Sequence, residues 1–129
     1  MRALTLLALT ATMAGTLTVS GCASDQEKWC DRVSAAAPTL GKTLDEGGAK
    51  TGLIDALPTL RSLADAAPSD VREDWSTLVD AVSGLADAVA AKDDKATRQA
   101  GLKLASPDVQ AAANAVDQEA RDVCHAGLF

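Results

Sequence analysis

Apolar residues recur at helical spacing along most of the chain after residue 24. The clearest stripe alternates steps of four and three residues, which places its members on one face of a helix. It consists of Val71, Trp75, Leu78, Val82, Leu85 and Val89. Aromatic residues, which favour strands, are scarce, since the chain has no Tyr, one Phe and two Trp. The pattern therefore predicts an all-α protein, with its surest helix over about residues 71–90.

The stretch from Asp25 to about residue 44 predicts a helix that begins with a capping box, because Ser24 is followed three residues later by Glu27. Pro38 predicts a break or kink near residue 37. Residues 45–48, with two glycines, predict a flexible turn after this helix. Its apolar face carries Cys30, Val33, Ala37, Leu40 and Leu44.

A second helix is expected over about residues 52–66, with Pro58 marking either a kink or a start near Asp55. Ser69 is the expected N-cap of the helix that carries the Trp75 stripe. A short helix over about residues 94–104 and a last helix from Pro107 to about Cys124 follow, the latter capped by Ser106. The final residues 127–129 are expected to be frayed or docked. Together these segments predict a small four-helix bundle with one extra short helix.

The first 21 residues have the composition of an export signal, with a positive start at Arg2 and an apolar run over residues 3–19. Small residues then precede a cysteine. Val19, Ser20, Gly21 and Cys22 resemble the lipobox of bacterial lipoproteins, and the resemblance implies that Cys22 becomes the acylated first residue. Residues 22–24 are then a short tether and residues 25–129 the helical domain. An ordinary cleaved signal peptide and an uncleaved anchor helix are the alternatives.

Lipidation of Cys22 resolves an odd number of cysteines, because it leaves Cys30 and Cys124 as a pair in an oxidising compartment. We expect a disulfide between them, which would stabilise the fold by about 4–5 kcal/mol in the chain-entropy model. Two reduced, buried cysteines and a metal site are the alternatives. Two cysteines with the single His125 are too few for a closed zinc site, and we expect no metal or cofactor.

The chain resembles the small Ala-rich secreted and lipid-anchored helical proteins of actinobacteria. The shared points are the early Trp29-Cys30 pair, the Ala67-Pro68-Ser69-Asp70-Val71 helix start and the late Cys124. That group has no established common activity, so the resemblance implies no function.

Charge narrows the range of partners. The net charge of −6 becomes −7 once Arg2 leaves with the leader, and an acidic chain without a basic stripe is a poor nucleic-acid binder. Residues 92–103 nevertheless carry a net charge of +2. They form the candidate interaction face, with ordinary solvated charge as the alternative. Its members are Lys92, Lys95, Arg98 and Lys103. We add Trp29 as a candidate surface aromatic, and the alternative for this residue is a ring packed over the disulfide.

Catalytic patterns are not visible in the sequence. His125 stands at the predicted end of a helix, and the acidic pairs 45–46, 73–74 and 93–94 are better explained as helix faces or caps. We therefore expect a non-enzymatic interaction module at the extracytoplasmic face of the cell membrane, held by the lipidated Cys22 and contacting an envelope protein. A carrier or sensor of an apolar small molecule is the alternative, and an enzyme is the least supported reading.

Overall fold

The computed structural model describes residues 24–129, and in this range the chain is helical with no strands. Four helices supply the buried residues of the core, whereas α4 buries none of its own residues. The prediction of an all-α four-helix bundle with one extra short helix is therefore confirmed. In chain order the elements are α1 (Asp25–Gly47), the π-helical turn η1 (Gly48–Gly52), α2 (Leu53–Ala66), α3 (Arg72–Ala90), α4 (Asp94–Leu104) and α5 (Pro107–Cys124).

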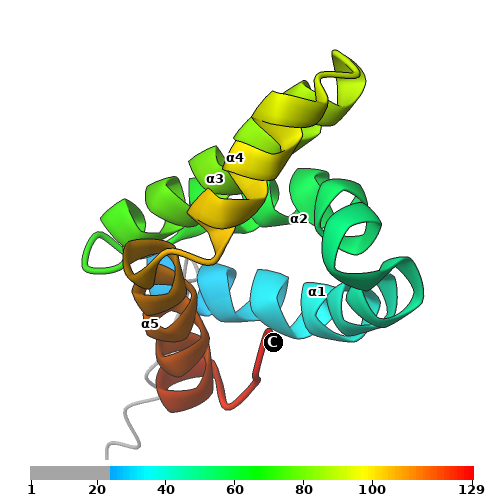
Figure 1. Ribbon diagram of the computed structural model, residues 1–129. Helices are drawn as coiled ribbons and strands as arrows, with labels where there is room; N and C mark the ends of the chain where they lie inside the picture. Colours follow the sequence, from blue (N-terminus) through cyan, green and yellow to red (C-terminus); the bar gives the residue numbers. More distant parts are fainter. Residues whose placement is uncertain (1–23) are drawn as a thin grey trace, which may run out of the picture.

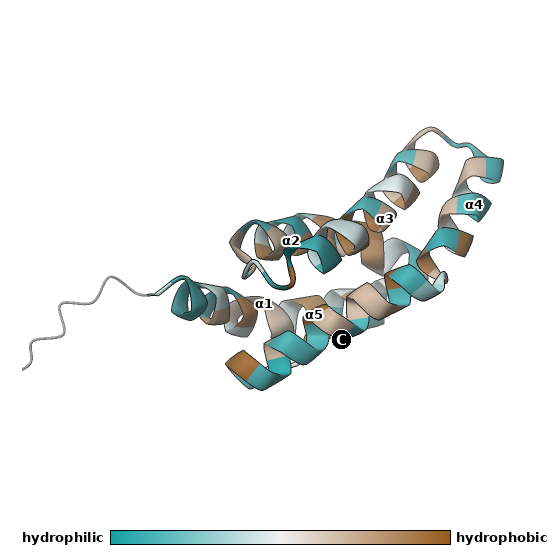
Figure 2. Cartoon of the chain, turned by 90° about the vertical axis from the view of Figure 1, so that its left-hand side faces the viewer, coloured by the Kyte–Doolittle hydropathy of each residue, from teal (hydrophilic) through white to brown (hydrophobic). Residues whose placement is uncertain are grey.

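Helices α1 and α2 form one hairpin, and α3 and α4 form a second one (Figure 1). α5 crosses the first part of α1 and returns the chain to the side at which α1 begins. The α3–α4 hairpin extends away from that side, as the second view shows (Figure 2). The fold thus has two unlike ends, one formed by the start of α1 with α5 and one formed by the hairpin tip.

None of the helices among residues 24–129 is both long enough and apolar enough to cross a membrane.

Two tryptophans occupy the centre of the core. Trp29 of α1 and Trp75 of α3 are fully buried, with ring centroids 5.7 Å apart and ring planes at 83° to each other. This edge-to-face arrangement is favourable for aromatic rings. Aliphatic side chains from α1, α2, α3 and α5 surround the pair, the largest fully buried ones being Val33, Leu40, Leu60, Leu63, Val82, Val109 and Val116.

The start of α1 has the predicted capping box. The Ser24 hydroxyl accepts a hydrogen bond from the Glu27 N–H at 3.1 Å, and the Glu27 carboxylate accepts one from the Ser24 N–H at 2.6 Å. These bonds satisfy two donors that a helix start otherwise leaves without a partner. The first turn of α1 is consequently an ordered boundary of the domain.

A disulfide joins the two ends of the helical domain, as predicted. Cys30 of α1 and Cys124 at the end of α5 have Sγ atoms 2.05 Å apart and Cα atoms 5.0 Å apart. Both side chains are half-buried against the core. The bridge fastens α5 to the first turns of α1, so the beginning and the end of the bundle lie together.

Two proline predictions need correction. α1 runs through Pro38 to Gly47 without interruption, so of the predicted break or kink near residue 37, the break is wrong. α2 begins at Leu53 and contains Pro58, so the start near Asp55 is also wrong. Both prolines are exposed. On an exposed face water can hydrate the carbonyl that loses its N–H partner, which makes a proline tolerable inside a helix.

The flexible turn predicted over residues 45–48 is wrong, because α1 continues to Gly47 and a π-helical turn, η1, follows over Gly48–Gly52. Gly48 has a φ of 66°, which glycine adopts without strain. A Cβ on Gly52 would lie 2.9 Å from the Thr43 carbonyl oxygen, and a Cβ on Gly47 would lie 2.5 Å from the backbone of Gly52. These two glycines therefore let the backbones of the α1–α2 corner meet directly.

The helix start predicted at Ser69 is also wrong. α3 begins at Arg72, and the N-cap position is held by Val71, which makes no side-chain capping bond. Val71 is buried in the core cluster. Burial of this side chain, rather than capping chemistry, decides where the helix begins. Ser106, by contrast, is the N-cap residue of α5 with Pro107 following it, as predicted, although its side chain makes no capping bond.

The C-terminal tail is docked rather than frayed. Leu128 is buried in the core, and one oxygen of the Asp117 carboxylate accepts hydrogen bonds from the N–H groups of Leu128 at 2.6 Å and Phe129 at 3.1 Å. Arg121 contacts the other Asp117 oxygen at 2.7 Å and the Phe129 carbonyl oxygen at 3.0 Å. Asp117 and Arg121 together fasten the tail along α5.

Removal of the disulfide is expected to lower the free energy of unfolding by about 4–5 kcal/mol, because the unfolded chain regains the entropy that the closed loop withholds. Chemical denaturation of the Cys30→Ser, Cys124→Ser and double variants measures this loss. All three should unfold at the same lowered denaturant midpoint as the reduced wild-type protein. A double variant as stable as the oxidised protein would contradict the role of the bridge.

Tail docking is expected to depend on pH through Asp117. Burial alone raises the pKa of this carboxyl, but the hydrogen bonds from Leu128, Arg121 and Phe129 and the Arg121 charge outweigh it and lower the pKa below its ordinary value. A lowered folded-state pKa adds stability above the unfolded pKa, and this stability is lost as the pH falls through the folded one. Unfolding free energies of the wild type and Asp117→Asn should differ by about 1.5–3 kcal/mol at neutral pH.

This difference should shrink as the pH falls below the ordinary carboxyl pKa of about 3.9 and then through the lowered folded-state pKa of Asp117. The matched control is Asp122→Asn, an exposed carboxyl one turn further along α5. A difference between wild type and Asp117→Asn that stays constant down to pH 2 would contradict the assignment.

Candidate interaction site

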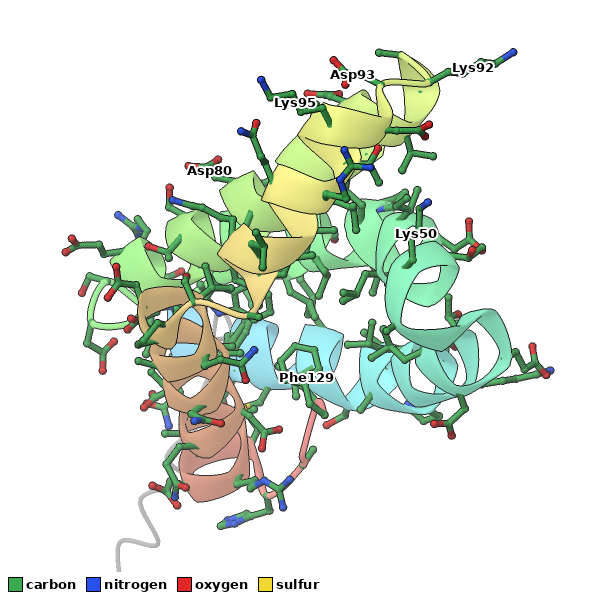
Figure 3. The ribbon with its side chains drawn as sticks, viewed as in Figure 1. Lys50, Asp80, Lys92, Asp93, Lys95 and Phe129 are labelled. Carbon is green, nitrogen blue, oxygen red and sulfur yellow. A yellow bond between two sulfur atoms is a disulfide. The ribbon has the colours of Figure 1, made fainter. Side chains whose placement is uncertain are left out.

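The tip of the α3–α4 hairpin has an ordered backbone. The Lys92 N–H donates to the Val89 carbonyl at 3.0 Å, and the Asp93 N–H donates to the Ala88 carbonyl at 3.1 Å. Asp93 then caps α4, accepting a hydrogen bond from the Ala96 N–H at 2.9 Å. Lys92 has a φ of 55°, a conformation that few residues other than glycine adopt. The turn thus presents the Lys92 side chain at the extremity of the hairpin (Figure 3).

The two sides of α4 differ in chemistry. Its inner side is half-buried, and the residues of that side are Ala96, Thr97, Ala100 and Leu104. Its outer side carries Lys95, Arg98 and Leu102, whose spacing of three and four residues puts them on one line along the helix. Leu102 is 73% exposed, the largest exposure of any large apolar side chain between residues 24 and 129. We call Lys95, Arg98 and Leu102 the outer face of α4, with Lys103 at its edge.

The cations of this region have no counter-ion among the described residues. The ion pairs over residues 24–129 join Lys28 to Asp25, Lys42 to Glu46 and Arg121 to Asp117. The four predicted cations, Lys92, Lys95, Arg98 and Lys103, belong to none of them, and all four are exposed. Figure 3 shows Lys92 and Lys95 extending from the hairpin into solvent. All four residues thus lie on one hairpin, but Lys92 and Lys95 point to opposite sides of its tip in Figure 3.

Trp29 does not belong to this surface, and its assignment as an exposed binding residue is wrong. Its side chain has no exposed area and packs edge-on against Trp75. The alternative, a ring packed in the core next to the Cys30 bridge, fits its position. The sequence spacing already indicated a buried Trp29, because this residue precedes Val33 by four residues and Leu40 by eleven, and both are core residues.

The lipobox residues Val19, Ser20 and Gly21, and the lipid-attachment residue Cys22, lie outside the residues that the structure describes. The adjoining domain boundary is described. α1 begins at Asp25, three residues after Cys22, and the capping box orders Ser24. Ser24, the last residue of the tether predicted over residues 22–24, is thus part of a helix cap.

A cleft of about 710 Å³ lies at the end of the fold where α1 begins. Charged side chains of both signs surround it, from the first turns of α1, the end of α2, the α2–α3 loop and Glu119 of α5. Burial raises the pKa of Glu119 above its ordinary value, and the charges of Asp70 and Asp122 raise it further. This mixture of charges suits a hydrated surface cleft rather than an apolar ligand.

A second cleft, of about 460 Å³, follows the junction of α1 and α2. It is a shallow, open groove lined by Arg32, Ala35, Ala36, Thr39, Pro58, Thr59, Ser62 and Leu63. Arg32 donates to the Ser62 carbonyl and hydroxyl oxygens, both at 3.2 Å, and so bridges the two helices. Neither cleft is the enclosed apolar space that a carrier of apolar molecules requires.

The remaining candidates for chemistry lie on helix ends. His125 is exposed at the C-cap of α5, with a φ of 55°. Asp93 is a cap, Glu73 and Asp74 lie in the first turn of α3, and Glu46 is paired with Lys42. Within residues 24–129 no group of three or more His, Cys, Asp or Glu residues is arranged to hold a metal ion.

One member of the outer face of α4 was missed by the sequence reasoning. Leu102 was not singled out, because an apolar residue in a helix is ordinarily assigned to its buried side. Its spacing of seven residues from Lys95 and four from Arg98 was a usable signal, since it places Leu102 with the cations and away from Ala96 and Ala100.

Comparisons of the chain with protein-family models, with curated proteins and with solved structures found no match.

Proposed function

We propose that this chain is a lipid-anchored, non-enzymatic interaction module of the cell envelope, which presents the α3–α4 hairpin to a partner protein. The observation that carries the proposal is the outer side of α4. This helix has no buried residue, and its exposed cations have no counter-ion among residues 24–129. A helix of this kind contributes little to the core, so binding gives a reason for its composition.

The construction of the other end supports the same proposal. The capping box orders the start of α1, and the disulfide fastens α5 to it a few residues further on. Attachment at Cys22 would therefore hold an ordered domain close to the bilayer, on the extracytoplasmic face. The hairpin points away from the start of α1 (Figures 1 and 2), so its tip would face the space beyond the membrane.

Covalent lipid supplies the membrane affinity in this proposal. The chain is acidic overall, with a net charge of −6, and is repelled by anionic headgroups. The acyl chains on one cysteine provide more than one anchor, which is sufficient for stable attachment.

Replacement of Cys22 is expected to abolish membrane attachment. In the native host, full-length wild-type protein should sediment with membranes and enter the detergent phase on phase separation. Cys22→Ala should lose both properties, because no thiol remains for acylation. The control is Ala23→Ser, which leaves the thiol in place. A Cys22→Ala chain that stays in the membrane with its leader removed would contradict the lipid anchor.

The interaction role is expected to appear as site-specific crosslinking in living cells. A photoreactive residue at Gln99, exposed on α4, should form an adduct with one envelope protein. The same residue at Asn114, exposed on α5, is the positional control and should form that adduct weakly. Failure of every exposed position tested on α1, α4 and α5 to form an adduct would contradict the module.

A further inference from the structure

We infer that the outer face of α4 binds an acidic helical segment of another protein, one in which carboxylates lie in line with an apolar side chain. The inference rests on the proposed function and specifies which surface acts and which partner chemistry it selects. Three features of the described residues support it. They are the cations without an ion-pair partner, the exposed Leu102 in line with Lys95 and Arg98, and the direction of the hairpin.

Charge favours an acidic partner. Lys95 and Arg98 are exposed on the outer face, with Lys92 and Lys103 at its two ends. The carboxylate of Asp93 is engaged as the cap of α4. The neighbouring helix α3 also presents exposed carboxylates, Asp80 and Asp87, but neither forms an ion pair with α4. Asp94 is exposed at the start of α4 but forms no ion pair either, so carboxylates supplied from outside would meet cations that are unpaired within residues 24–129.

The exposed Leu102 favours a protein partner over a polyanionic polymer. It is 73% exposed and lies on one line with Arg98 and Lys95. Seven residues of helix span about 10 Å, which is two turns of a partner helix. A partner helix with carboxylates and an apolar residue at the same spacing matches this line in charge and apolar contact. A phosphate polymer offers charge but has no apolar group for Leu102.

The direction of the hairpin disfavours the bilayer as occupant. The tip lies on the opposite side of the molecule from the start of α1 in both views (Figures 1 and 2). A domain attached just before α1 would therefore hold Lys92 and the outer face of α4 away from the headgroups. The same geometry keeps this face from the α1 end of a neighbouring copy that is anchored in parallel.

The test uses the full-length protein in detergent micelles and a fluorescent synthetic helical peptide with two Glu and one Leu at the spacing of Lys95, Arg98 and Leu102. Anisotropy measures the dissociation constant. Lys95→Gln/Arg98→Gln should weaken binding about tenfold. Leu102→Ala should weaken it about fivefold. The matched control is Lys50→Gln/Arg72→Gln, which removes two exposed cations elsewhere and should leave binding within about twofold.

All five substituted residues are exposed, so each variant should keep the wild-type unfolding midpoint, which thermal denaturation checks. An equal loss of affinity in the control variant would overturn the inference, because binding would then follow total charge. So would absence of peptide binding. Tighter binding to polyphosphate or to anionic phospholipid vesicles, unchanged by Leu102→Ala, would assign the face to a polymer or a bilayer instead. Self-association that the Leu102→Ala substitution abolishes would assign it to a second copy.

Crosslinking in cells separates this inference from the proposed function. An adduct at Gln99 whose crosslinked peptide carries Asp or Glu beside an apolar residue supports both. An adduct from Asn114 alone would overturn the α4 surface and leave the interaction module standing. Absence of adducts from every position would overturn the module as well.

Discussion

The arrangement of the helices depends on the contact between Trp29 and Trp75. No Cα atom of α1 lies within 8 Å of a Cα atom of α3, so the two helices are not direct neighbours. The two indoles fill the space between them, edge to face, at the centre of a core whose other members are Val, Leu and Ala, with the half-buried bridge beside it. Loss of either ring would leave a cavity into which the surrounding structure relaxes only in part.

This contact also has a cost. The indole N–H groups of Trp29 and Trp75 are buried without a hydrogen-bond acceptor among the described residues. Each unpaired donor costs about 1–3 kcal/mol, against which the burial of two large rings is favourable. The disulfide next to Trp29 stabilises the folded state further, because α5 could otherwise separate from α1 and admit water to the rings. The aromatic pair and the bridge therefore act as one unit at the α1 end of the fold.

The helices and the disulfide were predictable because they follow from short-range spacing and a simple cysteine count. The Trp75 stripe is buried along α3 except at Val89, which is half-buried near the free hairpin tip. The errors share a different origin. The start of α3 follows from the burial of Val71, and the α1–α2 corner follows from the meeting of Gly47 with Gly52. Both are contacts between segments, which local propensity does not describe. The outer face of α4 was located by charge, and its apolar member Leu102 could also have been located, by its spacing from Lys95 and Arg98.

The bridge between Cys30 and Cys124 changes how the domain carries mechanical load. A pull between α4 and the start of α1 divides into two covalent routes that meet again at Cys30. One route runs through α3, α2 and most of α1, and the other runs through α5 and across the disulfide. Straightening either route alone cannot lengthen the molecule, since the other still spans the same points. A partner held at the hairpin would therefore be tethered by a closed ring of chain, which resists extension even when one of its helices yields.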